Sequence, residues 1–426
     1  MVGALLAVIS VSLVGQAIYS IFLSLYSWQH PERLKASSGP DVQVEPKTSF
    51  SILVPARDEA KVIFSTLASI VAANYPEDLL QIIVVCPEND DGTIAEVHRA
   101  AREYPRSDIH VAFVSGENAS KPQSLNAGLK YCTGDVVAVF DAEDEVHAAV
   151  FGQVNTLFVR EGPDLGVVQG GVQLVNFGDR WFGMHNCLEY YFWYKSRLHY
   201  HANMGMIPLG GNTVFFRREL LDEIGGWDNS CLTEDADIGI RLSVLGKRMK
   251  VVYNAYCATQ EEIPVSTGAF IRQRTRWQQG YLQVLGKGDW RRLPRLRQRL
   301  LAFYTLSFPI IQAVLFLLWG VAITGELWLK QPAVIAILTF LPAYAILLQL
   351  QTNIVAAYLF TREYRFRFSW LAPLTMTLTY LPYQWMLGIG ALRAVLRVML
   401  GRNDWEKTDH NGGHRPDVGG SAPAIA

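Results

Sequence analysis

Long uncharged apolar stretches divide this chain of 426 residues into a membrane part and a central part. Residues 3–26 carry no charged side chain and are long enough for a helix to cross a lipid bilayer. The stretch has neither the basic start nor the small-residue cleavage site of a secretory signal peptide. Three more apolar stretches follow, at 303–325, 332–360 and 368–392. The sequence therefore predicts an integral membrane protein with a large soluble domain between its spans.

The distribution of Lys and Arg predicts the side of the membrane on which this domain lies. Basic residues follow the first apolar stretch at Arg33, Lys35 and Lys47, and a basic segment at 290–300 precedes the second. Such residues are enriched in cytoplasmic segments, so we expect a cytosolic domain on a bacterial inner or plasma membrane. The expected parts are a transmembrane helix at 1–28, the cytosolic domain at 45–289, an amphipathic interfacial helix at 290–302, about three spans within 303–400, and a partly disordered tail at 401–426.

Charge and cysteine content exclude some classes of function. The formal net charge of -1 provides no electrostatic field for nucleic acid. The five cysteines lie in the central domain without a Cys-x-x-Cys pair, so we expect reduced core thiols rather than disulfides or metal ligands.

The first half of the central domain alternates apolar strands with helices. Strands are predicted at 50–56, 81–86, 110–114 and 136–140, and helices at 59–73, 93–104 and 121–132. Strands that are apolar on both faces and are joined by helices indicate an α/β fold, in which helices cover both sides of a parallel sheet.

Carboxylates follow three of these strands, in the segments ARDEA, PENDDG and DAEDE. The carboxyl ends of parallel strands lie at one edge of the sheet, where such folds bind ligands. An acidic surface turn explains one such segment. Three at one edge favour a polar ligand that brings a cation, with Mg²⁺ or Mn²⁺ bound between the carboxylates and a diphosphate.

Ordered motifs then show a family resemblance. The segments DAED at 141–144, LTEDADIGIRL at 232–242 and QRTRW at 273–277 resemble the DxD, TED and QxxRW motifs of membrane-embedded family-2 glycosyltransferases. That group contains the cellulose, chitin and hyaluronan synthases. The resemblance covers about residues 50–285, and it implies a Rossmann-like domain of the GT-A type that uses a nucleotide sugar, here a UDP-sugar.

The resemblance implies ligands for the donor. Asp141 and Glu143 correspond to the DxD acids, with Glu143 at the metal-binding position and Asp141 near the nucleotide. The second acid is Glu instead of Asp, so Asp144 remains a competing metal ligand. Lys121 begins a predicted helix and is a natural partner for a phosphate, although a solvated surface lysine is the alternative. Three more acids, in the first two strand-end segments, are candidates for ribose or base contacts: Glu59, Glu88 and Asp90.

The TED segment implies the catalytic base. The acceptor hydroxyl must lose a proton as it attacks, which requires a carboxylate or histidine within hydrogen-bond reach. By resemblance Asp235 is that base and Glu234 is its neighbour, whereas capping of a helix is the alternative role. A single displacement inverts the anomeric carbon and therefore predicts a β-linked product from an α-linked donor.

The QxxRW segment implies contacts to both substrates. Gln273 and Trp277 are four residues apart and share a helix face. By resemblance Gln273 and Arg276 belong to the donor site, where Arg276 contacts the diphosphate. Trp277 forms the floor of the acceptor site, although a membrane-interface anchor is the alternative. Gly211 and Asn212 suit an acceptor-binding loop, for which an ordinary glycine turn is the alternative.

Four functions compete. The leading hypothesis is a synthase of a β-linked polysaccharide, coupled to its export and served by export or accessory subunits. The second is a non-processive transferase that adds one sugar to a lipid-linked acceptor. A silent scaffold and a transporter are the others, but the intact motifs argue against a scaffold and the small number of spans argues against a transporter. The expected partners are the nucleotide-sugar donor, a glycan or lipid-linked acceptor, and membrane lipids. The segment at 403–412 resembles an active-site element of related synthases, which requires a cytosolic tail.

Overall fold

The computed structural model describes residues 2–116, 119–328 and 333–402. The principal helices are α1 (Val2–Leu25), α2 (Pro31–Ser38), α3 (Ile63–Val71), α4 (Asp91–Glu103), α5 (Lys121–Leu129), α6 (Val150–Glu161), α7 (Gly183–Phe192), α8 (Leu198–Met204), α9 (Arg218–Ile224), α10 (Glu234–Val244), α11 (Thr267–Lys287), α12 (Leu296–Trp328), α13 (Ala333–Glu363) and α14 (Ala372–Met399). The strands are β1 (Phe50–Pro55), β2 (Leu80–Pro87), β3 (Asp108–Val114), β4 (Val136–Val139), β5 (Leu165–Gly170), β6 (Val172–Leu174), β7 (Val214–Arg217), β8 (Arg248–Val252) and β9 (Thr259–Glu261).

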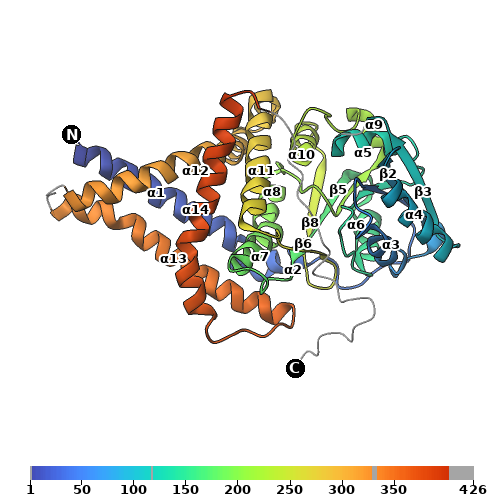
Figure 1. The fold of residues 1–426 in the computed structure, drawn as a ribbon, viewed down its shortest axis with the longest axis horizontal. Coiled ribbons are helices and arrows are strands. Elements are labelled where there is room, and N and C mark those ends of the chain that lie inside the picture. Colours follow the sequence, from blue (N-terminus) through green and yellow to red (C-terminus); the bar gives the residue numbers. More distant parts are fainter. Residues whose placement is uncertain (1, 117–118, 329–332, 403–426) are drawn as a thin grey trace.

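Seven of these strands form one mixed sheet in the order β3–β2–β1–β4–β7–β5–β8. Strands β1 to β4 are parallel, as predicted, whereas β7 runs antiparallel to both β4 and β5. The sheet lies at one end of the molecule, and α1, α12 and α13 project together from the other end (Figure 1). A second, two-stranded sheet joins β6 to β9. The α/β domain is therefore inserted between apolar helices.

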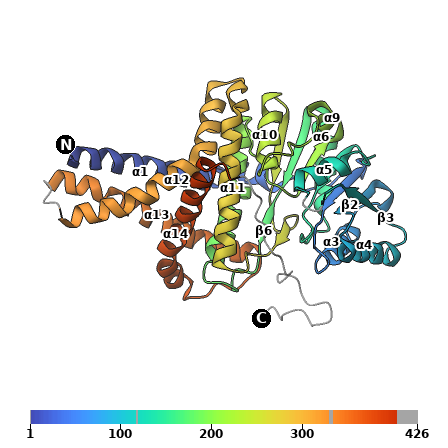
Figure 2. The same cartoon turned by 45° about the horizontal axis from the view of Figure 1, so that its top comes forward.

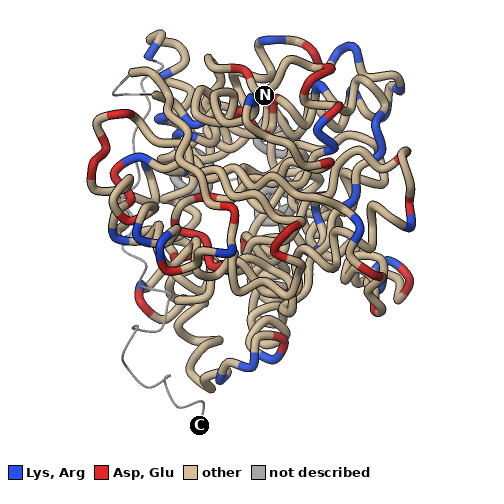
Figure 3. The backbone as a smooth tube through the Cα atoms, turned by 90° about the vertical axis from the view of Figure 1, so that its right-hand side faces the viewer, with Lys and Arg blue, Asp and Glu red and all other residues tan. Residues whose placement is uncertain are grey.

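Two cores cover the two faces of the main sheet. Alternate residues of β1 point to opposite faces, so Ile52 and Val54 join one buried cluster and Leu53 joins the other. Strands buried on both faces are apolar at nearly every position, which explains why their sequences show no alternation. The five cysteines are also buried. Lys and Arg are interspersed with Asp and Glu over the outer part of the domain (Figure 3).

Two predicted helices have different bounds in the structure. Helix α3 begins at Ile63 rather than at 59, because Asp58 takes a positive φ of 57° and residues 59–62 form a turn. The expected interfacial helix at 290–302 is wrong as a single element. A short 3₁₀ helix, Asp289–Arg292, ends at Leu293, and α12 begins at Leu296. The break lies at Pro294, because proline disfavours helical backbone angles at the residue before it, and Leu293 has an extended ψ of 137°.

Three helices in the described part of the chain are long and apolar enough to cross a membrane. These segments are Val8–Gln29, Leu296–Leu318 and Leu341–Glu363. The third stretch expected to span after the domain forms α14, which is not among them. Instead α14 lies beside α11, where the backbone at Gly390 approaches the side chain of Arg274 closely (Figures 1 and 2). The segment at 403–412 lies outside the described residues.

Candidate active site

Strand pairing brings two loops of the site together. Antiparallel β7 begins at Val214 opposite Val139, the residue at which β4 ends. The loop that leaves β4, residues 140–145, therefore lies at the same sheet edge as the loop that enters β7, residues 210–213. The predicted metal and acceptor residues meet there because one strand reverses direction, which the sequence pattern did not predict.

Lys121 lies at the centre of this edge. It begins α5 after a capping box formed by Ser120 and Gln123. Its Nζ atom forms an ion pair with Asp141, donates to the carbonyl oxygen of Gly211 at 2.8 Å, and lies 4.0 Å from Oε1 of Glu234. Burial alone would lower the pKa of Lys121, but the carboxylates of Asp141 and Glu234 outweigh burial and raise it. Lys121 is therefore a cation held by acids from two segments and a backbone carbonyl from a third, not a solvated surface lysine.

Asp144 and Glu143 occupy different environments although they are adjacent. Asp144 is fully buried, and its Oδ2 atom accepts from the backbone N–H of Asp141 at 2.8 Å. The side-chain amide of Asn212 donates to Asp144 Oδ1 at 3.0 Å and also to Glu261. Burial and the nearby Glu261 raise the pKa of Asp144 well above its ordinary value. Asp144 and Asn212 thus hold the two loops together, whereas Glu143 is only partly buried.

Glu234 and Asp235 lie in the first turn of α10. A Cβ atom on Gly211 would be 3.2 Å from Oδ2 of Asp235, so glycine lets the loop approach this carboxylate. Burial raises the pKa of Asp235 to about 6. Burial and the neighbouring Asp235 raise the pKa of Glu234 to about 8. Adjacent carboxyls with separated pKa values are typical of acid–base sites.

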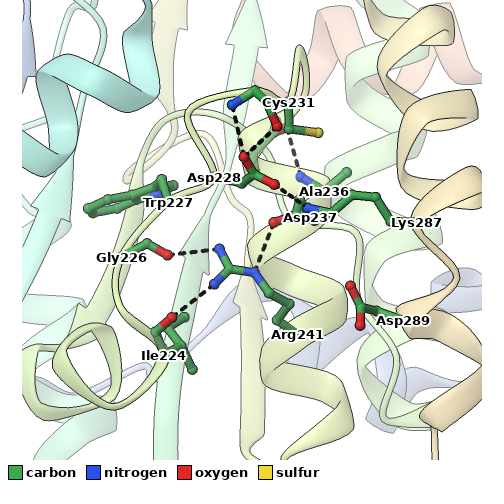
Figure 4. Close-up of polar contacts among 12 residues, drawn as sticks. Ile224, Gly226, Trp227, Asp228, Cys231, Ala236, Asp237, Arg241, Lys287 and Asp289 are labelled. Atoms are coloured by element: carbon green, nitrogen blue, oxygen red, sulfur yellow. Dashed lines mark hydrogen bonds and ion pairs between the residues drawn. The ribbon is translucent and has the colours of Figure 1, made fainter.

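Asp237, one turn further along α10, faces the other way. It is 1% exposed, accepts from Nε of Arg241 at 2.8 Å, and pairs with Lys287 at the end of α11. Lys287 also pairs with Asp228 at 2.6 Å (Figure 4). Asp237 therefore ties the helix of the TED segment to the helix of the QxxRW segment and is not a second candidate base.

Arg276 of α11 faces the acids of the site. Burial lowers the pKa of its guanidinium, and the carboxylates of Glu234, Asp141 and Glu143 oppose that shift. Gln273 lies one turn away on the same helix, where its side chain accepts from Arg274 at 3.3 Å. The structure thus brings Arg276 to the same acids as Lys121. Gln273 lies three residues before Arg276 on α11.

Trp277 rests on a buried arginine that the motif does not include. The guanidinium of Arg274 lies 4.2 Å from the centre of the Trp277 ring. Arg274 also donates to Asn186 and Glu189 of α7, at 2.6 Å in both cases. Residues 274 and 276 point in roughly opposite directions on a helix, and only the second arginine belongs to the recognised motif. In the sequence, the only signal for contacts on a second face of α11 was the presence of two arginines in QRTRW, one of which the motif does not explain.

The acids after β1 and β2 form a separate group. Asp90 caps α4, because Oδ1 accepts from the backbone of Thr93 at 3.2 Å, and its Oδ2 accepts from the backbone of Asp58 at 2.7 Å. The backbone of Glu59 donates to the Thr93 hydroxyl at 2.9 Å. Glu88 is exposed and forms no hydrogen bond or ion pair with any residue that the structure describes. The two loops are thus joined to each other, and Glu88 is not in contact with the cluster around Lys121.

Sequence reasoning also missed the residues that shape the loop at 210–213. Gln169 of β5 accepts from the backbone of Gly210 at 2.8 Å and donates to the carbonyl oxygen of Asn212 at 3.0 Å. Thr213 holds a positive φ of 50°, which is uncommon for a β-branched residue. A buried glutamine inside an apolar strand was the available signal, since such groups need hydrogen-bond partners. Glu261, on a strand of three residues, offered no comparable signal.

Comparison with known proteins identifies the family. The sequence profile described as "Glycosyltransferase like family 2" matches residues 46–280, which is more than half of the chain. The chain belongs to glycosyltransferase family 2. The expectation of a family-2 glycosyltransferase domain is therefore confirmed.

Relatives of this family-2 protein carry names that point to different products, a glucolipid in one case and a polymer in another. A β-monoglucosyldiacylglycerol synthase of Synechocystis is 28% identical over 305 residues, which cover 68% of this chain and 61% of that relative. The probable glycosyltransferase YdaM of Bacillus subtilis is 28% identical and is matched over 68% of its length. A poly-β-1,6-N-acetyl-D-glucosamine synthase of Staphylococcus aureus is 25% identical, with 71% of each chain covered. The chain thus matches less than two thirds of the cyanobacterial relative.

One solved structure confirms the predicted GT-A fold. The mannosyltransferase PcManGT of Pyrobaculum calidifontis, in complex with GDP-Man and Mn²⁺, aligns with a TM-score of 0.55 and 20% identity. The alignment covers 93% of this chain and 99% of that one. The common fold includes the mixed sheet at whose edge Lys121 lies.

Proposed function

We propose that this protein transfers a hexose from a UDP-sugar to an acceptor at the membrane surface, with inversion at the anomeric carbon. One observation carries the proposal: Lys121, Asp141, Gly211 and the Glu234–Asp235 pair come from four separate segments and meet at one sheet edge. Such a cluster of acids and cations suits a diphosphate leaving group and an attacking hydroxyl.

Donor binding follows from the positive charges. Lys121 and Arg276 supply two cations for the diphosphate, and Gln273 lies on the same helix as Arg276. The joined loops that contain Glu59 and Asp90 supply the nucleoside contacts, with Glu88 at their exposed edge. This assignment rests on the position of these loops after β1 and β2, which neighbour β4 in the sheet.

The acids of the site suit a divalent metal ion that the nucleotide helps to bind. Among the described residues, no group of three or more Asp, Glu, His or Cys side chains lies close enough to hold a metal ion alone. A magnesium-type ion is usually bound by one or two carboxylates together with substrate phosphates. Glu143 and Asp141 are the carboxylates that would hold it here, and the bound ion would stabilise the charge of the departing diphosphate.

Asp235 is the base that removes the proton from the acceptor hydroxyl. Its pKa is the lower of the pair, so Asp235 is ionised while Glu234 keeps a proton near neutral pH. Gly211 leaves its carboxylate open to the loop side, where an acceptor hydroxyl would lie. A base on one face and the leaving group on the other give direct displacement and a β-linked product.

This assignment predicts an unusual pH profile. Because the raised pKa leaves Asp235 protonated below about pH 6, kcat/KM should fall about tenfold per pH unit below that point. A base of ordinary pKa would stay ionised to about pH 4. The measurement is UDP release across a pH series. Circular dichroism at each pH is the control for unfolding, and a flat profile down to about pH 5 would contradict the assignment.

The surroundings of Trp277 favour a role in the acceptor site over a role as a membrane anchor. Trp277 is partly buried between Arg274 and Tyr190, and the centres of the Trp277 and Tyr190 rings lie 6.2 Å apart. Trp277→Phe should fold normally and bind UDP but turn over roughly 10²-fold more slowly, since a smaller ring displaces the attacking hydroxyl by about 1 Å. Turnover and melting temperature should be measured together. Early melting with normal turnover per folded molecule would favour the anchor.

The orientation of the chain follows from the number of spans. One candidate span precedes the domain and two follow it. Two crossings return the chain to its starting side, where α14 packs along α11. With the domain in the cytosol, as the distribution of Lys and Arg predicts, α14 would lie there too. The resemblance of the segment at 403–412 to an active-site element requires the same side. Protease digestion of sealed vesicles tests this arrangement.

The leading product is a β-linked polysaccharide, and the alternative is a lipid that carries one added sugar. Similarity to the staphylococcal polymer synthase favours the first, and similarity to the cyanobacterial glucolipid synthase favours the second. Purified protein should be incubated in lipid with single UDP-sugars, and the product separated by size and by extraction into organic solvent. A long water-soluble chain would indicate the polymer, and a labelled lipid would indicate the alternative. Absence of transfer from all donors would overturn both.

A further inference from the structure

Helices α7 and α8 are continuous through one π-helical turn, Trp193–Arg197. Single π-helical turns occur frequently at functional sites. This turn contacts the C-terminal ends of two apolar helices, α1 and α13. The hydroxyl of Ser27, at the end of α1, donates to the backbone of Lys195 at 2.7 Å, and Lys195 pairs with Glu363 at the end of α13.

Arg197 in this turn is partly buried and has only neutral partners. Its Nη2 atom donates to the hydroxyls of Ser20 at 2.7 Å and Ser24 at 2.9 Å, and Nε donates to Ser24 at 3.2 Å. No Asp or Glu side chain that the structure describes lies within 4 Å of the guanidinium, since Arg197 is absent from every described ion pair. The nearby cations Lys195 and Arg274 differ from Arg197 because each pairs with a carboxylate, Glu363 and Glu189 respectively.

The position of Arg197 makes the absence of a paired carboxylate among the described residues unfavourable in free energy. Ser20 and Ser24 belong to the candidate span Val8–Gln29 and are themselves buried, so the guanidinium lies against a covered face near the end of that helix. A charge at such depth is normally paired or functional. Serine hydroxyls satisfy hydrogen bonds but supply no negative charge.

The surroundings suit a headgroup rather than a protein carboxylate. Tyr304, near the start of α12, packs edge-on against Tyr19 of α1 at 5.0 Å. Tyr200 of α8 packs edge-on against Tyr26 at 5.1 Å. Tyrosines with one polar end are enriched at the depth of lipid headgroups. Arg197 thus lies in an aromatic and hydroxyl-rich junction between α1, α8 and α12.

We propose that Arg197 binds the phosphate of a membrane lipid whose acyl chains lie along α1 and α12. All hydrogen bonds of the guanidinium to described residues use Nε and Nη2, which leaves the Nη1 hydrogens for a phosphate oxygen. Arginine binds phosphate through such paired donors.

The same helix connects this phosphate site to the acceptor floor. Glu189, which holds Arg274 under Trp277, precedes Arg197 by eight residues, or about 12 Å along the helix axis. A lipid held at Arg197 would therefore lie within a few sugar units of Trp277. If the bound lipid is the sugar acceptor, the link between this site and Trp277 rests on the proposed function. If the bound lipid is not an acceptor, the phosphate site is independent of that function.

Lipid binding can be tested without any sugar transfer. The full chain in detergent is titrated with phosphatidylglycerol and with diacylglycerol, which has no phosphate, and bound lipid is counted by native mass spectrometry. Wild-type protein should bind phosphatidylglycerol selectively, and Arg197→Gln should bind it at least about tenfold more weakly, since a hydrogen bond to a charged group is lost. Arg197→Lys should retain part of the affinity.

Arg33→Gln is the matched control. Arg33 also lies just beyond α1, where its guanidinium stacks on Tyr26 at 4.2 Å, so its loss removes a nearby positive charge but leaves the hydrogen bonds of Arg197 to Ser20 and Ser24 in place. This variant should bind phosphatidylglycerol like wild type. Equal binding by Arg197→Gln, or equal binding of diacylglycerol by wild type, would overturn the proposal.

A second experiment distinguishes an acceptor lipid from a bystander lipid as the source of the phosphate. With a radiolabelled UDP-sugar, an acceptor lipid becomes labelled, whereas a bystander lipid changes only the rate of transfer to another product. Label on the lipid that is lost in Arg197→Gln would assign an acceptor. Selective binding without any transfer would leave the phosphate site in place and count against the proposed function alone.

Discussion

We expect Asp235→Asn to abolish sugar transfer while leaving UDP binding nearly unchanged. The amide has the same shape but cannot accept the acceptor's proton, and loss of a positioned base costs roughly 10²–10⁴-fold in rate. Asp235 lies beside Gly211 and not within the ion pair of Lys121 with Asp141, so the donor contacts should persist. The measurements are UDP release at saturating donor and UDP affinity by calorimetry.

Asp228→Asn is the control for this experiment. Asp228 precedes the same helix, but it pairs with Lys287 on the far side and is partly exposed (Figure 4). Its loss should lower stability slightly and leave kcat within about twofold, because surface ion pairs contribute little. Transfer by Asp235→Asn at the wild-type rate would remove Asp235 from the role of base.

We expect removal of divalent cations to stop turnover and addition of Mg²⁺ or Mn²⁺ to restore it. A bound metal ion contributes several kcal/mol to leaving-group stabilisation, so chelation by EDTA should lower the rate by on the order of 10²–10³-fold. Full activity in metal-free buffer would instead assign the neutralisation of the diphosphate to Lys121 and Arg276 alone. Tm before and after chelation is the control for unfolding.

The same assay separates the two candidate metal ligands. Glu143→Gln should raise the metal concentration that gives half-maximal rate, because Glu143 stands at the metal-binding position of the DxD-like motif and is only partly buried. Asp144→Ala should mainly lower Tm, because it leaves the backbone N–H of Asp141 and the amide of Asn212 without an acceptor. The reverse pattern would make Asp144 the ligand.

Local sequence patterns determine much of this protein by themselves. Ile52, Leu53 and Val54 are apolar in sequence, and this pattern predicts a strand buried on both faces. Acids that follow parallel strands must lie at one sheet edge, so Asp141 and Asp90 are placed on the correct side of the domain. Each inference needs only the geometry of one element or of neighbouring strands, which local residue types are sufficient to specify.

Only the tertiary structure distinguishes between neighbouring residues of the same type. Glu143 and Asp144 look equivalent in sequence, but Asn212, 68 residues away from Asp144, commits that acid to the loop. Asp237 is removed from the site by Lys287, 50 residues away. The stretch at 368–392 is apolar enough in sequence to be expected as a span, yet α14 packs along α11. The physical reason is common to all three: burial and partner choice depend on segments distant in sequence, and no local spacing encodes them.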